Sequence, residues 1–147
     1  MNKIVQTLIT VLTLACSALS LHAEKIVAGP KGGRLVATEP LQAEFFVNKD
    51  RKAEVTFYDA SLKPAAIQEQ VVALIAETPG GRSTIGLQKT STGFISVDAL
   101  PAGESYRIVM QVREKPNTKP QNFRINFNMA ECGECKHAEY ACTCDDH

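Results

Sequence analysis

Residues 24–130 of this 147-residue chain contain neither cysteine nor histidine. All five cysteines and all three histidines lie in residues 1–23 or 131–147. A nucleophile activated by an imidazole needs both groups in one site, so Ser-His-Asp and Cys-His arrangements are excluded from the long central region. Its GPKGG stretch (residues 29–33) lacks the Lys-Ser/Thr continuation of a phosphate-binding loop and precedes a predicted strand, not a helix. We therefore expect no enzymatic activity.

The chain also lacks an excess of charge of either sign, with 16 basic and 16 acidic side chains. Such a balance favours neither a nucleic acid nor an anionic membrane surface as partner. The acidic residues of the central region fall at predicted strand faces and turns, where a solvated carboxylate is the ordinary outcome. This expectation covers Glu44, Glu54, Asp59 and Asp98.

The first 23 residues are typical of a secretory signal peptide. One charge, Lys3, precedes an apolar stretch, and the small residue Ala23 stands directly before charged residues, as at a signal-peptidase site. The most apolar part is too short for a membrane span. We expect export to the periplasm or cell envelope. Lipidation of Cys16 is the alternative, and it would hold the protein at a membrane.

Short alternating segments, separated by Gly, Pro and Asn/Asp, fill the central region. Residues 41–47 and 53–59 alternate on either side of a polar turn, which is a hairpin signal. Residues 71–77 are continuously apolar, as in a strand buried on both faces, and a helix over 65–76 is the competing interpretation. The other predicted strands cover residues 34–38, 83–88, 93–97, 106–113 and 123–129. Seven or eight strands at this spacing predict an all-β fold, an Ig-like antiparallel β-sandwich with an irregular Cys-rich C-terminal tail.

Several stretches of the central region carry a resemblance to a known group of proteins. They are GGRLV (32–36), AEFFV (43–47), VTFYDASLKPA (55–65), LPAGESYRIVMQVR (100–113) and FRINF (123–127). The chain resembles small exported Ig-like β-sandwich proteins, some of them encoded beside heavy-metal efflux systems. Lys31 stands where many of these chains have histidine, so the resemblance implies no metal ligand at that turn. The cysteine tail lies outside the resemblance.

The tail, ECGECKHAEYACTCDDH, holds four of the five cysteines as a C-x2-C pair and a C-x-C pair six residues apart. Four thiolates make a tetrahedral zinc site, and soft sulfur equally suits Cu(I). A histidine could replace one sulfur, and the five carboxylates of the tail would offset the charge of the ion. The predicted ligands for Zn(II) or Cu(I) are Cys132, Cys135, Cys142, Cys144, His137 and His147. The predicted role is sequestration of the ion or its transfer to a protein partner in the cell envelope.

Disulfides are the main alternative, because four cysteines in an oxidising compartment first predict two bridges. A bridge between Cys142 and Cys144 would close a strained ring, which favours nested bridges (Cys132–Cys144 with Cys135–Cys142) or crossed ones. The protein would then be a structural or interaction module with a locked tail. Thiol exchange is a third interpretation, although the acidic Gly133-Glu134 segment should raise the pKa of its C-x-x-C thiols.

The predicted organisation is a signal peptide (1–23), a β-sandwich domain (24–130) and a Cys-rich acidic tail (131–147). No predicted strand contains a cysteine. We therefore expect the strands to contain the whole apolar core, and the sandwich to fold without its tail.

Overall fold

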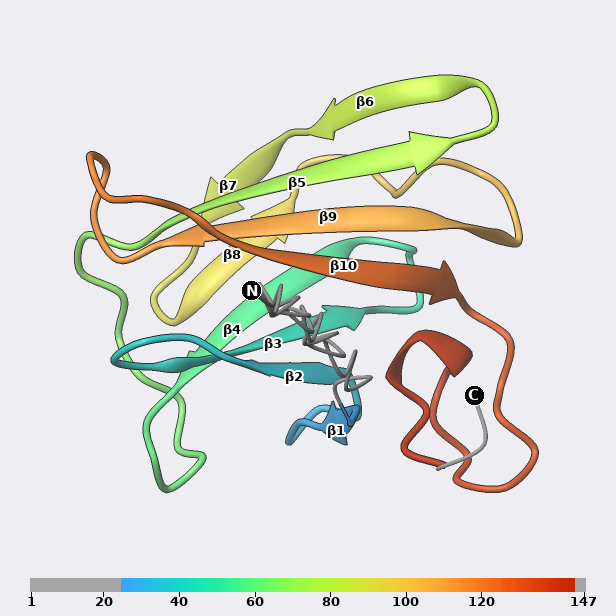
Figure 1. Cartoon of the computed structure of the whole chain (residues 1–147), viewed down its shortest axis with the longest axis horizontal. Coiled ribbons are helices and arrows are strands. Elements are labelled where there is room, and N and C mark those ends of the chain that lie inside the picture. Colours follow the sequence, from blue (N-terminus) through green and yellow to red (C-terminus); the bar gives the residue numbers. More distant parts are fainter. Residues whose placement is uncertain (1–24, 145–147) are drawn as a thin grey trace, which may run out of the picture.

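The computed structural model describes residues 25–144 and contains two antiparallel β-sheets that pack face to face (Figure 1). One sheet has the strand order β1-β2-β3-β4-β8-β7, and the other has the order β10-β9-β5-β6. The strands are β1 (Val27–Ala28), β2 (Arg34–Ala37), β3 (Gln42–Val47), β4 (Ala53–Tyr58), β5 (Val71–Thr78), β6 (Gly81–Ile85), β7 (Leu87–Lys89), β8 (Gly93–Ser96), β9 (Ser105–Arg113) and β10 (Gln121–Asn128). The predicted β-sandwich is confirmed, while its Ig-like character stays a prediction.

The strand alternation predicted from the sequence is confirmed for the main hairpin, where β3 pairs with β4. Residues 71–78 form the strand β5, so the competing helix is wrong. The predicted single strand at 83–88 is divided at Gly86 into β6, which pairs with β5, and β7, which pairs with β8. The chain crosses there from one sheet to the other and closes one side of the sandwich, which alternation within a single strand cannot indicate.

The core lies between the two sheets and consists of the alternating side chains of the strands. Phe45, Phe57, Leu74, Ile108 and Phe127 are almost completely buried. Both sheets contribute large apolar side chains, as a sandwich requires, since each sheet buries one face against the other.

Glu44 is a buried charged residue in this otherwise apolar setting, with no exposed surface. Its carboxylate accepts hydrogen bonds from the backbone N–H groups of Lys31 (2.9 Å) and Gly33 (2.8 Å) and from the Tyr58 hydroxyl (2.7 Å). A side chain at Gly29 would overlap this carboxylate, so the 29–33 loop closes over it only with glycine there. The expectation that Glu44 is solvated is wrong, because these donors offset the cost of burying its charge.

The C-terminal segment lies beside β2 and β10, at the side of the sandwich where β1 and β10 are the edge strands (Figure 1). Its 3-10 turn η1 (Glu139–Ala141) places Tyr140 and Ala141 in the hydrophobic core. The Tyr140 ring lies 5.5 Å from the ring of Phe45 in one sheet and 5.7 Å from that of Phe127 in the other, between ring centroids. The expectation that the strands alone contain the core is wrong, because this tyrosine packs against both sheets.

Within residues 25–144, no helix has the length and apolar character needed to cross a membrane. The predicted signal peptide with Cys16, and the predicted ligand His147, lie outside the described residues.

Candidate metal centre

The C-x2-C half of the motif lies in a tight turn at the start of the cysteine lobe, defined here as residues 131–144. The backbone N–H of Cys132 donates to the His137 carbonyl at 2.8 Å, and the N–H of Lys136 donates to the Cys132 carbonyl at 3.2 Å. Lys136 has a φ of 65°, a left-handed conformation that reverses the chain directly after Cys135. Both thiols of the pair therefore lie in one compact turn.

The second pair follows the 3-10 turn, which is anchored in the core. The Tyr140 hydroxyl accepts a hydrogen bond from the backbone N–H of Val47 at 3.0 Å, and its side chain is 3% exposed. The N–H of Cys142 then donates to the Glu139 carbonyl at 3.2 Å. This anchoring places Cys142 and Cys144 against the first pair.

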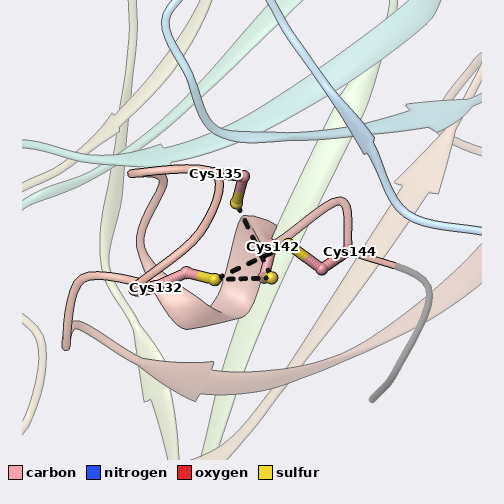
Figure 2. A group of neighbouring side chains, drawn as sticks. All are labelled: Cys132, Cys135, Cys142 and Cys144. Carbon is pink, nitrogen blue, oxygen red and sulfur yellow. Dashed lines mark hydrogen bonds between the residues drawn. The ribbon is translucent and has the colours of Figure 1, made fainter.

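The four sulfur atoms form a single cluster, in which all lie within 4.8 Å of one another (Figure 2). The Sγ–Sγ distances are 3.1 Å for Cys132–Cys142, 3.7 Å for Cys135–Cys142 and 3.8 Å for Cys132–Cys144. A tetrahedron with metal–sulfur bonds of about 2.3 Å has edges of about 3.8 Å. Two of the three distances match that edge, the third is shorter, and every other Sγ–Sγ distance in the cluster is at most 4.8 Å, so the four sulfurs lie near the separations of a tetrahedral site.

Among the described residues, no disulfide joins the four cysteines of the lobe. Each of the three Sγ–Sγ distances exceeds the bond length of a disulfide, about 2.05 Å. The two distances near 3.8 Å belong to the nested pairs, Cys132–Cys144 and Cys135–Cys142, whereas the shortest belongs to a crossed pair. The same fold therefore brings together the partners of either predicted set of bridges.

The electrostatic surroundings of the thiols differ. Backbone N–H groups of Thr143 and His137 hydrogen-bond to the sulfur of Cys135 and lower the pKa of that thiol to about 6. Neighbouring thiols raise the pKa of Cys142, through Cys132, and the pKa of Cys144, through Cys142. The expectation that nearby acidic residues would raise the pKa of both C-x-x-C thiols is wrong for Cys135, because backbone donors dominate there.

A bound cation would change this balance by favouring the thiolate form of each ligand. The lowered pKa of the Cys135 thiol favours its ionisation, and the sulfurs of Cys132, Cys135 and Cys142 share hydrogen bonds. The four cysteines could hold a metal ion, and they would give up protons as it binds.

His137 is not a member of the four-residue cluster. It lies against the 29–33 loop, where a Cβ added to Gly32 would be 3.4 Å from the imidazole Nδ1. Gly32 has a φ of 81°, so the loop requires glycine there for its backbone as well. The contact joins the cysteine lobe to the loop that closes over Glu44.

Sequence reasoning missed Tyr140, which positions the second cysteine pair. The available signal was an aromatic residue two positions before Cys142 in an otherwise small and polar segment. Such a residue is normally buried against a core, since its large apolar surface favours burial.

Comparisons with protein families, with curated proteins and with solved structures found no match for this chain. The resemblance to exported β-sandwich proteins stays a prediction. The case for a metal centre rests on the geometry and chemistry of the four cysteines.

Proposed function

We propose that this protein is an exported, non-enzymatic β-sandwich protein that binds one soft or borderline metal ion, Zn(II) or Cu(I). The ligands are Cys132, Cys135, Cys142 and Cys144. The proposal rests on one observation, the convergence of four thiols within 4.8 Å. Export follows from the N-terminal pattern, and the physiological role is sequestration of the ion or its transfer to a partner in the cell envelope.

The spacing of the sulfurs supports a bound ion. Four thiols that lie almost at tetrahedral separation need only small movements to enclose Zn(II), which takes four such ligands in a closed site. Cu(I) is equally suited by the softness of thiolate sulfur. Sulfur can supply every bond in either case, so His137 and His147 are not needed as ligands.

The competing function is a structural or interaction module whose tail is locked by two disulfides. The observation in its favour is that the nested pairs, Cys132–Cys144 and Cys135–Cys142, lie 3.8 and 3.7 Å apart. Two such bridges would leave no thiol for an ion. The two functions therefore differ in the number of free thiols and in bound metal, both of which can be measured directly.

Mass spectrometry of protein isolated without reductant from the compartment to which it is exported separates the two. We expect one metal ion per chain under native conditions, four free thiols after denaturation, and a chain that begins at Glu24. A metal-free chain lighter by four hydrogens, with no free thiols, would overturn the metal proposal. A variant with serine at all four positions is the matched control and should bind no ion.

A diacylated N-terminus at Cys16, found in the same measurement, would show a membrane-anchored protein. Export would stand in that case, and the partners would be those of a membrane surface.

A further inference from the structure

The cysteine cluster has a buried pair and an exposed pair. Cys132 and Cys142 are 3% and 2% exposed, whereas Cys135 and Cys144 are only partly exposed and are called the exposed pair below. Figure 2 shows that Cys135 and Cys144 approach Cys132 and Cys142 from different segments of the lobe. Molecules in solution would therefore reach an ion at the centre of the cluster more easily past Cys135 and Cys144 than past Cys132 and Cys142.

The buried pair is attached to the sandwich core. Cys142 directly follows Ala141, which has no exposed surface, and Tyr140, whose ring packs against both sheets. Cys132 follows the end of β10 closely, and its sulfur lies 3.1 Å from that of Cys142. Both thiols are therefore buried at the base of the lobe, and Cys142 is held there by core residues that directly precede it.

The exposed pair lacks such an attachment. Cys135 lies in a turn whose neighbours Gly133, Glu134 and Lys136 are all exposed, and the lobe contributes no buried residue between Cys132 and Tyr140. Cys144 is the last described residue of the chain and is separated from the core by Thr143. Their sulfurs can leave an ion without disturbing the core.

We propose that the ion enters and leaves through the Cys135–Cys144 side, by ligand exchange with a partner protein that presents a thiol. This inference rests on the proposed metal-binding function and names the chemistry of the partner. A thiol is the group that competes with thiolates for Zn(II) or Cu(I). Cys132 and Cys142 are the first ligands to engage the ion and the last to release it.

The exchange step balances without an oxidant or reductant. A sulfur of the partner loses its proton and bonds to the ion, the bond from Cys135 or Cys144 to the ion breaks, and the departing thiolate takes up a proton. The charge of the ion is unchanged. A second exchange at the other exposed cysteine leaves the ion shared between two buried and two incoming sulfurs.

The test uses the complete exported chain loaded anaerobically with one Cu(I) and treated with limiting iodoacetamide, followed by peptide mapping. We expect Cys135 and Cys144 to be alkylated about tenfold or more faster than Cys132 and Cys142, because reactivity follows access. In denaturant without metal, the four rates should become similar, which is the internal control. Equal rates in the loaded, folded protein, or earlier alkylation of the buried pair, would overturn the inference.

Transfer to a thiol acceptor supplies a second measurement, with dithiothreitol as the probe. Cys135→Ser and Cys144→Ser should retain one Cu(I) through desalting and release it faster than the wild type. Cys132→Ser and Cys142→Ser should lose the ion during desalting. Faster release from the buried-pair variants with normal retention would contradict the assignment of the two sides. A wild-type chain that binds no Cu(I) or Zn(II) would instead overturn the proposed function itself.

Discussion

The sandwich and the cysteine lobe are held together by different forces. Residues 27–128 are joined by strand ladders around an apolar core. The lobe has one isolated bridge, Glu131 with Ala138, one 3-10 turn and few buried side chains, of which Tyr140 is the largest. A segment this small cannot bury enough apolar surface to fold alone and needs a cross-link or a metal. The stability of the lobe therefore depends on the packing of Tyr140 against the sandwich and on cross-links or a metal ion at its thiols.

Truncation after Ala130 should destabilise the sandwich more than any other change considered, because it removes Tyr140 and Ala141 from the core. Loss of a large buried aromatic costs about 3–5 kcal/mol. We expect the truncated protein to unfold at a clearly lower urea concentration than the full chain, as measured by circular dichroism. An unchanged midpoint would show that the sandwich is independent of the lobe, as the strand pattern alone predicts.

Removal of the metal should cause the next largest loss of stability. An ion that binds only the folded lobe stabilises it by about 4 kcal/mol at a free concentration a thousand times its dissociation constant. Thermal unfolding of the Zn(II)-loaded protein, with and without a chelator, measures this difference. The variant with serine at the four positions Cys132, Cys135, Cys142 and Cys144 should show no response to chelator, and a response in that variant would place the ion elsewhere.

Metal affinity should fall as the pH is lowered from slightly alkaline values to neutrality. The pKa values of Cys142 and Cys144 are raised, so both thiols are protonated at neutral pH and must each release a proton to bind. Release of these two protons alone weakens the apparent affinity about a hundredfold for each unit by which the pH is lowered. Competition with a chromophoric chelator between about pH 7 and pH 8 tests this. An affinity independent of pH would argue against thiol ligands.

Two tyrosines offer a finer comparison, because both contact Phe127 and both use their hydroxyl groups in hydrogen bonds. The Tyr140 hydroxyl accepts from the Val47 N–H, and the Tyr106 hydroxyl donates to the Pro101 carbonyl. Tyr140→Phe and Tyr106→Phe should each destabilise the fold by about 1 kcal/mol, with more for Tyr140 since a buried N–H is left unpaired.

Metal affinity distinguishes the two positions. Tyr140→Phe should weaken binding severalfold, since it loosens the turn that precedes Cys142, whereas Tyr106→Phe should leave the affinity unchanged. Equal effects on metal affinity would mean that Tyr140 acts only through global stability.

The smallest effect is expected for His137→Ala, since sulfur can supply all four bonds to the ion. The affinity of this variant for Zn(II) should stay within about twofold of that of the wild type, and the same chelator competition measures it. A tenfold loss would make the imidazole a ligand.

The alternation of apolar and polar residues was sufficient to predict most strands, because side chains in a strand alternate between two faces with a period of two. This alternation could not predict the burial of a residue that contacts distant segments of the chain. Glu44 occupies a non-core position of β3, and its burial depends on the 29–33 loop folding back over it. No neighbour of Glu44 in the sequence indicates that loop.

The candidate ligands likewise have features that the sequence could predict and one that it could not. The spacing of Cys132, Cys135, Cys142 and Cys144 was enough to propose a shared ion, since two close pairs in a short segment can converge in several conformations. It was not enough to separate buried from exposed ligands. That difference depends on where the lobe meets the sandwich.

The sequence by itself determined the strand periodicity, the supply of four thiols in one segment, and the absence of thiols and imidazoles from residues 24–130. Only the tertiary structure decided that the tail enters the core. The Val47 N–H and the Tyr140 hydroxyl meet across 93 positions of the chain. Contacts of that range depend on how two sheets pack, which periodicity within a strand does not encode.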